Sequence, residues 1–120
     1  ACIGAKKKKQ IKVGNLNVVR DFSWAPEIMK GVKHASKIKP CDLIFGSGVG
    51  ISIKNLIKRI FIHYHLDYKK FIIIDKDFFR KEDKKIMIAD ISQTIKKLKK
   101  FNWKPKIYRD RLVRKMINSL

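Results

Sequence analysis

Two arginines stand in similar settings, each at the exit of an extended-type segment and beside aromatic residues. Arg20 follows "GNLNVV", and Arg80 follows "FIIIDKDFF". A guanidinium group presents planar N–H donors that match the non-bridging oxygens of a phosphate. Two such groups brought together by the fold suit a diphosphate. The spacing leaves two hypotheses open, a diphosphate site or two ordinary surface arginines.

Other chemistry-bearing patterns favour structural roles. The stretch "DLIFGSGVGISIKNL" resembles a dinucleotide fingerprint, but its glycines are spaced by two and Ile51 occupies the third glycine position. We therefore expect a turn leading into a helix capped by Ser52. His63 and His65 are two residues apart and would point to different sides of a helix. No Tyr-x-x-x-Lys pattern is present. The sequence predicts no catalytic, cofactor-binding or metal-binding residue in this chain.

The elements that must position the arginines follow from hydrophobic periodicity. We expect residues 1–10 to be a helix end or a solvated lead-in. Strands are predicted at 11–14, 41–48, 71–75 and 86–90, and helices at 25–38, 52–64, from Asp90 onward and from Asp110 onward. Helices and short strands alternate, so the fold class is α/β, and residues 1–120 are predicted to form a single domain.

The formal net charge is +20, with 30 lysines and arginines against 10 acidic residues. Lysine dominates, and lysine, isoleucine, asparagine and phenylalanine are the residues that an AT-rich genome over-encodes, so the charge reflects either codon usage or function. In both cases we expect nonspecific binding of polyanions at low salt. No membrane span or signal peptide is recognisable, and two cysteines make no disulfide framework. We expect a reduced, cytoplasmic protein.

Five segments occur in a recognisable order: "GNLNVVRDFSWAPEIM", "FGSGVGISIKNLI", "IDKDFFRKED", "ADISQTIKKL" and "NWKP". They resemble the C-terminal part of the GDP-mannose 4,6-dehydratases, which belong to the extended short-chain dehydrogenase/reductase superfamily of NAD(P)-dependent epimerases and dehydratases. The resemblance covers nearly the whole chain. It implies the substrate-binding domain of that fold, with several helices packed on short strands and no complete Rossmann sheet.

The resemblance also implies binding roles. Arg20 and Arg80 match family arginines that contact the nucleotide-sugar phosphates or adjacent groups. Asp83 matches an acidic nucleotide-sugar contact, and Asn15 and Leu16 lie in the loop that lines the nucleotide side.

The chain departs from the family pattern near both arginines. Phe22 replaces a tryptophan, Trp24 a histidine and Lys81 a proline, and these changes alter the expected loop geometry. In family enzymes, the NADP fingerprint and the Tyr-x-x-x-Lys pair belong to an N-terminal Rossmann half. None of those residues is present in this chain, so we expect the chain alone to be catalytically inactive as a lyase and to hold no cofactor.

The first functional hypothesis is therefore a GDP-sugar-binding part of a GDP-mannose 4,6-dehydratase-like protein, whose partner is a Rossmann half supplied in trans or within a longer polypeptide. The second is a basic nucleic-acid-binding module. The third is a non-catalytic remnant that associates with itself to cover an apolar face.

Overall fold

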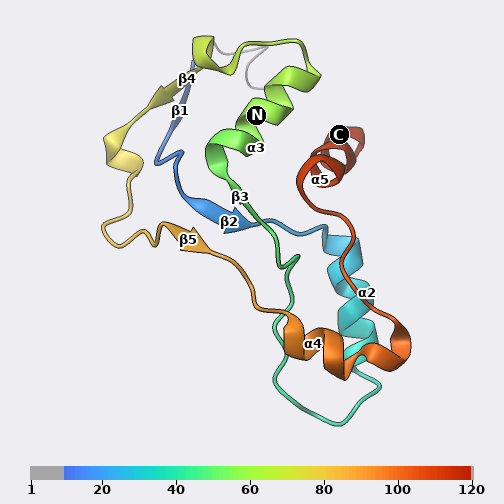
Figure 1. Ribbon diagram of the computed structural model, residues 1–120. Helices are drawn as coiled ribbons and strands as arrows, with labels where there is room; N and C mark the ends of the chain where they lie inside the picture. Colours follow the sequence, from blue (N-terminus) through green and yellow to red (C-terminus); the bar gives the residue numbers. More distant parts are fainter. Residues whose placement is uncertain (1–9, 120) are drawn as a thin grey trace. The chain divides into compact units, whose positions relative to one another are not determined.

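The computed structural model describes residues 10–119, so the expected lead-in lies almost entirely outside the described residues (Figure 1). Contacts divide the chain into two compact units. The first unit takes in the chain up to Arg20 together with Ile51–Ile86, and the second takes in Asp21–Gly50 and the chain from Met87 onward. The single domain over residues 1–120 stays a prediction.

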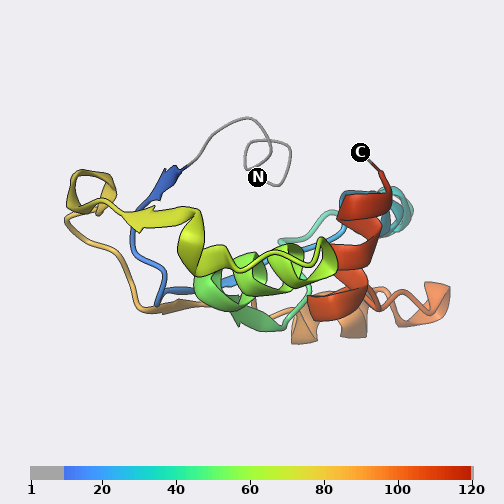
Figure 2. The same cartoon turned by 90° about the horizontal axis from the view of Figure 1, so that it is seen from above.

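The first unit is built on a parallel pair of strands, β1 (Ile11–Val13) and β4 (Ile72–Ile74), in which Ile11 pairs with Ile72. Helix α3 (Ile53–His63) and the short helix η1 (Tyr68–Lys70) follow each other along the chain and lie side by side (Figure 2). Phe61 of α3 is completely buried. Its neighbours are Ile11, Ile57, Ile60, Tyr64, Leu66, Tyr68, Phe71 and Ile72. The helix predicted at 52–64 is therefore confirmed, and its apolar face packs on the strands.

The predicted cap of α3 is confirmed as well. Ser52 has extended backbone angles, and its side chain accepts a hydrogen bond of 3.2 Å from the backbone N–H of Asn55. This bond satisfies one of the N–H groups that the first helical turn leaves without a partner.

The second unit gathers helices α2 (Ala25–Ala35), α4 (Ser92–Lys97), η3 (Lys99–Phe101) and α5 (Arg109–Asn118). Its buried side chains include Ile91, Thr94, Leu98, Trp103, Leu112 and Val113. Pro26 lies in the first turn of α2, where its missing N–H costs nothing. Glu27 ties α2 to a distant segment, since its carboxylate accepts the backbone N–H groups of Lys106 and Ile107 at 2.8 and 3.0 Å.

The remaining strands form a three-stranded sheet in the order β3 (Gly50–Ser52), β2 (Val19–Asp21) and β5 (Ile86–Met87). The remaining short helix, η2, covers Lys76–Phe78 and follows β4 in the chain. Helices and strands in two small sheets confirm the α/β class, and the described residues contain no complete Rossmann sheet. No helix among them is long and apolar enough to cross a membrane.

The predicted strand over residues 41–48 is wrong, because only Gly50–Ser52 forms a strand in this region. The backbone of Ile44 is instead satisfied by one buried side chain. The hydroxyl of Thr94 accepts from the N–H of Ile44 at 3.1 Å and donates to its carbonyl oxygen at 2.7 Å. The predicted strand 86–90 is confirmed only at Ile86–Met87, and the helix predicted at 25–38 ends at Ala35.

Candidate functional site

Arg20 is the middle residue of β2, within the strand rather than at its exit. One terminal nitrogen of the guanidinium donates to the carbonyl oxygens of Val19 and Lys84, at 2.7 and 2.9 Å. The other forms an ion pair with the carboxylate of Asp83. Both side chains are about four-fifths buried, with 20% and 19% exposed. The structure thus brings together two of the predicted site residues from positions 63 apart in the sequence.

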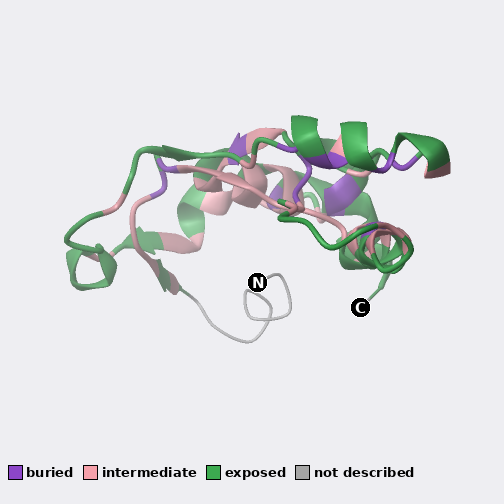
Figure 3. Cartoon of the chain, turned by 90° about the horizontal axis from the view of Figure 1, so that it is seen from below, coloured by how far each residue is buried: buried purple, intermediate pink, exposed green. Residues whose placement is uncertain are grey.

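Arg80 lies in the irregular segment between η2 and β5, which is exposed over most of its length (Figure 3). Within residues 10–119, no carboxylate forms an ion pair with Arg80. Asp83 follows three residues later, so its ion pair with Arg20 anchors the same segment to β2. The arrangement therefore presents an accessible guanidinium on a loop that a second arginine holds in place.

Asn15 and Leu16 precede β2 and differ in role. The side-chain oxygen of Asn15 accepts the backbone N–H of Asn17 at 3.0 Å, which closes a local turn. Leu16 is buried, and its carbonyl oxygen accepts the N–H of Lys54 at 2.9 Å. The Leu16 side chain also lines an open hollow of about 340 Å³. The other lining residues are Asn17, Lys54, Tyr68, Lys69, Ile72 and Ile74.

Asp21 organises a turn of the second unit, and no sequence pattern singles this residue out. One carboxylate oxygen accepts from the backbone N–H and the hydroxyl of Ser47, at 2.9 and 2.5 Å. The other accepts from the N–H groups of Gly48 and Ala89, at 2.8 and 3.3 Å. Consecutive backbone N–H groups that converge in this way make an anion-binding nest, and here the protein's own carboxylate fills it. The only sequence signal was an acidic residue directly after the arginine of "RD".

The glycines of "GSG" are required by this nest. A Cβ atom at Gly46 would lie 2.5 Å from the Cβ of Ala89 and 2.9 Å from a carboxylate oxygen of Asp21. Gly48 has a φ of +71°, which side-chain-bearing residues rarely adopt. The predicted turn before the Ser52-capped helix is confirmed, and its N–H donors serve Asp21. Among the described residues, no three histidine, cysteine or acidic side chains gather in a way that could hold a metal ion.

A family model described as GDP-mannose 4,6 dehydratase matches residues 1–116. The chain belongs to this family. GDP-mannose 4,6 dehydratases 1 and 2 of Arabidopsis thaliana are 25% and 24% identical to it over 108 residues. The aligned stretch is 89% of this chain but 29% and 28% of those relatives, so the chain spans less than a third of their length.

Solved structures share the fold. RMD of Pseudomonas aeruginosa, solved with NADPH, matches with a TM-score of 0.76 and 17% identity over 92% of this chain and 35% of that one. UDP-glucose 4-epimerase of Bifidobacterium longum, solved with NAD+ and UDP, matches with a TM-score of 0.75 and 20% identity over 97% of this chain and 36% of that one. The fold expected from the family resemblance is therefore confirmed.

Proposed function

We propose that this chain is the nucleotide-sugar-binding part of a GDP-mannose 4,6-dehydratase and that it binds the diphosphate of GDP-mannose beside β2. The observation that carries the proposal is the Arg20–Asp83 ion pair in a chain that matches the family over residues 1–116. This pair anchors the segment on which Arg80 is accessible. Because guanidinium groups bind phosphate oxygens through paired N–H donors, that segment suits an anionic ligand.

The remaining hydrogen-bonding capacity supports roles for both arginines. A guanidinium has five N–H donors, and the three bonds of Arg20 leave two of them for a phosphate oxygen. Arg80 supplies a second fork. Asp83 keeps oxygen lone pairs that can accept from a sugar hydroxyl, and the hollow lined by Leu16 offers apolar surface beside Asn15 for the rest of the nucleotide.

Catalysis needs groups from outside these 120 residues. The family resemblance assigns NADP and the catalytic tyrosine–lysine pair to a Rossmann half, which supplies the redox chemistry. This chain alone is expected to bind GDP-mannose weakly and to show no dehydratase activity.

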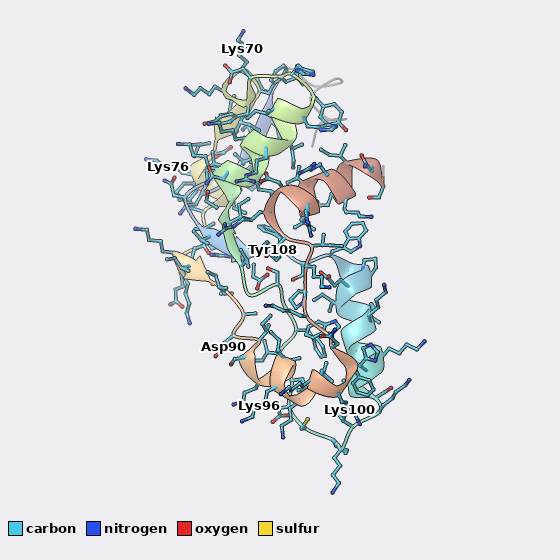
Figure 4. All side chains as sticks on the ribbon, turned by 45° about the vertical axis from the view of Figure 1, so that its right-hand side comes forward. Lys70, Lys76, Asp90, Lys96, Lys100 and Tyr108 are labelled. Carbon is cyan, nitrogen blue, oxygen red and sulfur yellow. The ribbon has the colours of Figure 1, made fainter. Side chains whose placement is uncertain are left out.

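Calorimetric titration with GDP-mannose tests the two arginines. Arg80→Ala and Arg20→Ala are each expected to weaken binding by about 1.5–3 kcal/mol, or about 10- to 150-fold, the scale of a hydrogen bond to a charged group. Lys76→Ala is the matched control, because Lys76 is an exposed cation in η2 of the same unit (Figure 4). It should change affinity less than twofold. Equal affinity in the wild type and both arginine variants would contradict the proposal.

Exposed apolar side chains in the first unit favour protein association as a second function. Ile74, Phe78 and Ile86 are 56%, 60% and 59% exposed. Large exposed apolar side chains often mark surfaces that another protein covers, here a Rossmann half or a second copy of the chain. Light scattering on the same samples is expected to detect self-association, and a strictly monomeric protein would count against the second copy.

A further inference from the structure

Helix α5 concentrates arginine in a chain that otherwise favours lysine. Three of the six arginines lie between Arg109 and Arg114. The helix buries Leu112 and Val113, while Arg111, Arg114 and Lys115 are exposed. Arginine offers a planar fork of donors that lysine lacks. A general bias toward lysine therefore does not account for the composition of this helix.

Three of the four exposed cations of α5 share one hollow. Arg111, Arg114, Lys115 and Asn118 line it together with Ile107, and its volume is about 500 Å³. Arg111 is three and four residues before the other two cations, so all three side chains leave the helix within about one turn, or 5.4 Å of rise. Asp110, the acidic residue of this helix, is not among the lining residues.

These cations are not neutralised within the described chain. None of the three forms an ion pair with a carboxylate among residues 10–119. Like charges three or four residues apart on a helix repel each other, so the cluster is unfavourable for the free protein. A bound polyanion would remove that repulsion and would gain several charge-assisted hydrogen bonds.

We propose that this hollow on α5 binds a compact polyphosphate group, either free or as the triphosphate of a nucleotide. Three cations within one helical turn match closely linked phosphates better than the phosphates of a nucleic-acid strand, which sugars hold apart. The amide of Asn118 supplies a further donor, and Ile107 supplies an apolar wall beside the charged groups. The proposed site shares no residue with the proposed GDP-mannose site.

Calorimetric titration with inorganic tripolyphosphate at near-physiological salt tests the site. Replacement of Arg111, Arg114 and Lys115 by glutamine keeps good helix formers and removes three charges. We expect affinity to fall by about tenfold or more, as lost bonds to charged groups imply. The matched control replaces Lys96, Lys97 and Lys99 by glutamine, which removes three exposed charges from α4 and η3 of the same unit. It should weaken binding less than about threefold.

Titrations with GTP and with a short RNA distinguish between the possible ligands of this hollow. Tighter binding of GTP than of tripolyphosphate identifies a nucleotide as the ligand, provided that the α5 triple variant abolishes the difference, because GTP could also enter the proposed GDP-mannose site. The reverse order identifies free polyphosphate, and both outcomes support the site. Equal weakening in the two triple variants would overturn it, because the whole-protein field alone would then explain binding. If a ten-nucleotide single-stranded RNA bound as tightly as tripolyphosphate through the same three residues, the proposal that the ligand is compact would be overturned.

The test is independent of the proposed GDP-mannose site. Arg80→Ala is expected to leave tripolyphosphate affinity unchanged, and the α5 triple variant is expected to leave GDP-mannose affinity nearly unchanged. If Arg80→Ala weakened tripolyphosphate binding as strongly as the α5 changes, the α5 site would be overturned.

Discussion

Replacement of Asp21 by asparagine is expected to destabilise the second unit by about 2–4 kcal/mol. Each carboxylate oxygen accepts at least one backbone N–H, from Ser47 on one side and from Gly48 and Ala89 on the other. An asparagine has one acceptor oxygen, so its NH2 group must face at least one of these donors. The loss of one charge-assisted bond costs about 1.5–3 kcal/mol, and the bonds that remain lose their charge assistance.

Urea unfolding followed by tryptophan fluorescence measures this change, because Trp24 and Trp103 both belong to the second unit. Asp42→Asn is the matched control. Asp42 is an exposed residue of the same unit, and its replacement should change the free energy of unfolding by no more than about 0.5 kcal/mol. Equal unfolding midpoints for the two variants would refute the role of Asp21 as the organiser of the glycine turn.

Two further predictions concern one contact in each unit. Gly31→Ala should lower the free energy of unfolding by about 1–2 kcal/mol, because a Cβ atom would lie 2.6 Å from Trp103 and 2.8 Å from Phe45. Such overpacking outweighs the roughly 1 kcal/mol that alanine gains over glycine in a helix. A higher urea midpoint for the variant would contradict this. Hydrogen bonds from the Lys12 side chain and then from a backbone N–H lower the pKa of Asp75, so their stabilisation is present above the ordinary aspartate pKa of about 3.9 and is lost as pH falls through the folded value. Lys12→Met should therefore lower the thermal midpoint more at pH 6 than at pH 2.5, and an equal difference at the two pH values would argue against the pair.

Local patterns in the sequence predict the helices well, because their causes lie within a few residues. In α3, the packed residues Ile57, Ile60 and Phe61 recur at helical spacing. Ser52 caps the same helix by accepting the N–H of Asn55, three residues further on. The failures come from distant partners. Apolar periodicity favoured a strand at residues 41–48, whereas Thr94, 50 residues away from Ile44, supplies the hydrogen bonds that a neighbouring strand would have supplied.

The candidate site shows the same contrast between local patterns, which are predictable, and distant partners, which are not. The settings of Arg20 and Arg80 singled out the two arginines, and the family resemblance added Asp83. No local pattern predicts the ion pair between Arg20 and Asp83, whose partners are 63 residues apart. The glycine turn was correctly expected to be structural, yet the reason lies in Asp21, 26 residues before Ser47. Periodicity reveals which side chains share a face, whereas a carboxylate that accepts from a distant turn leaves no periodic trace.

Charge pairing within this chain also bears on which cations are candidates for binding an external anion. With 30 basic and 10 acidic residues, at least 20 cations must lack a one-to-one carboxylate partner, so an unpaired lysine carries little information. The position of a cation in the fold is more informative. One carboxylate pairs with Arg20 and thereby also fixes the segment that bears Arg80. Arg111, Arg114 and Lys115 line one hollow that has no carboxylate among its lining residues. Arginines that are exposed on an anchored segment or gathered around a hollow are candidates for binding an external phosphate, because no carboxylate among residues 10–119 forms an ion pair with them.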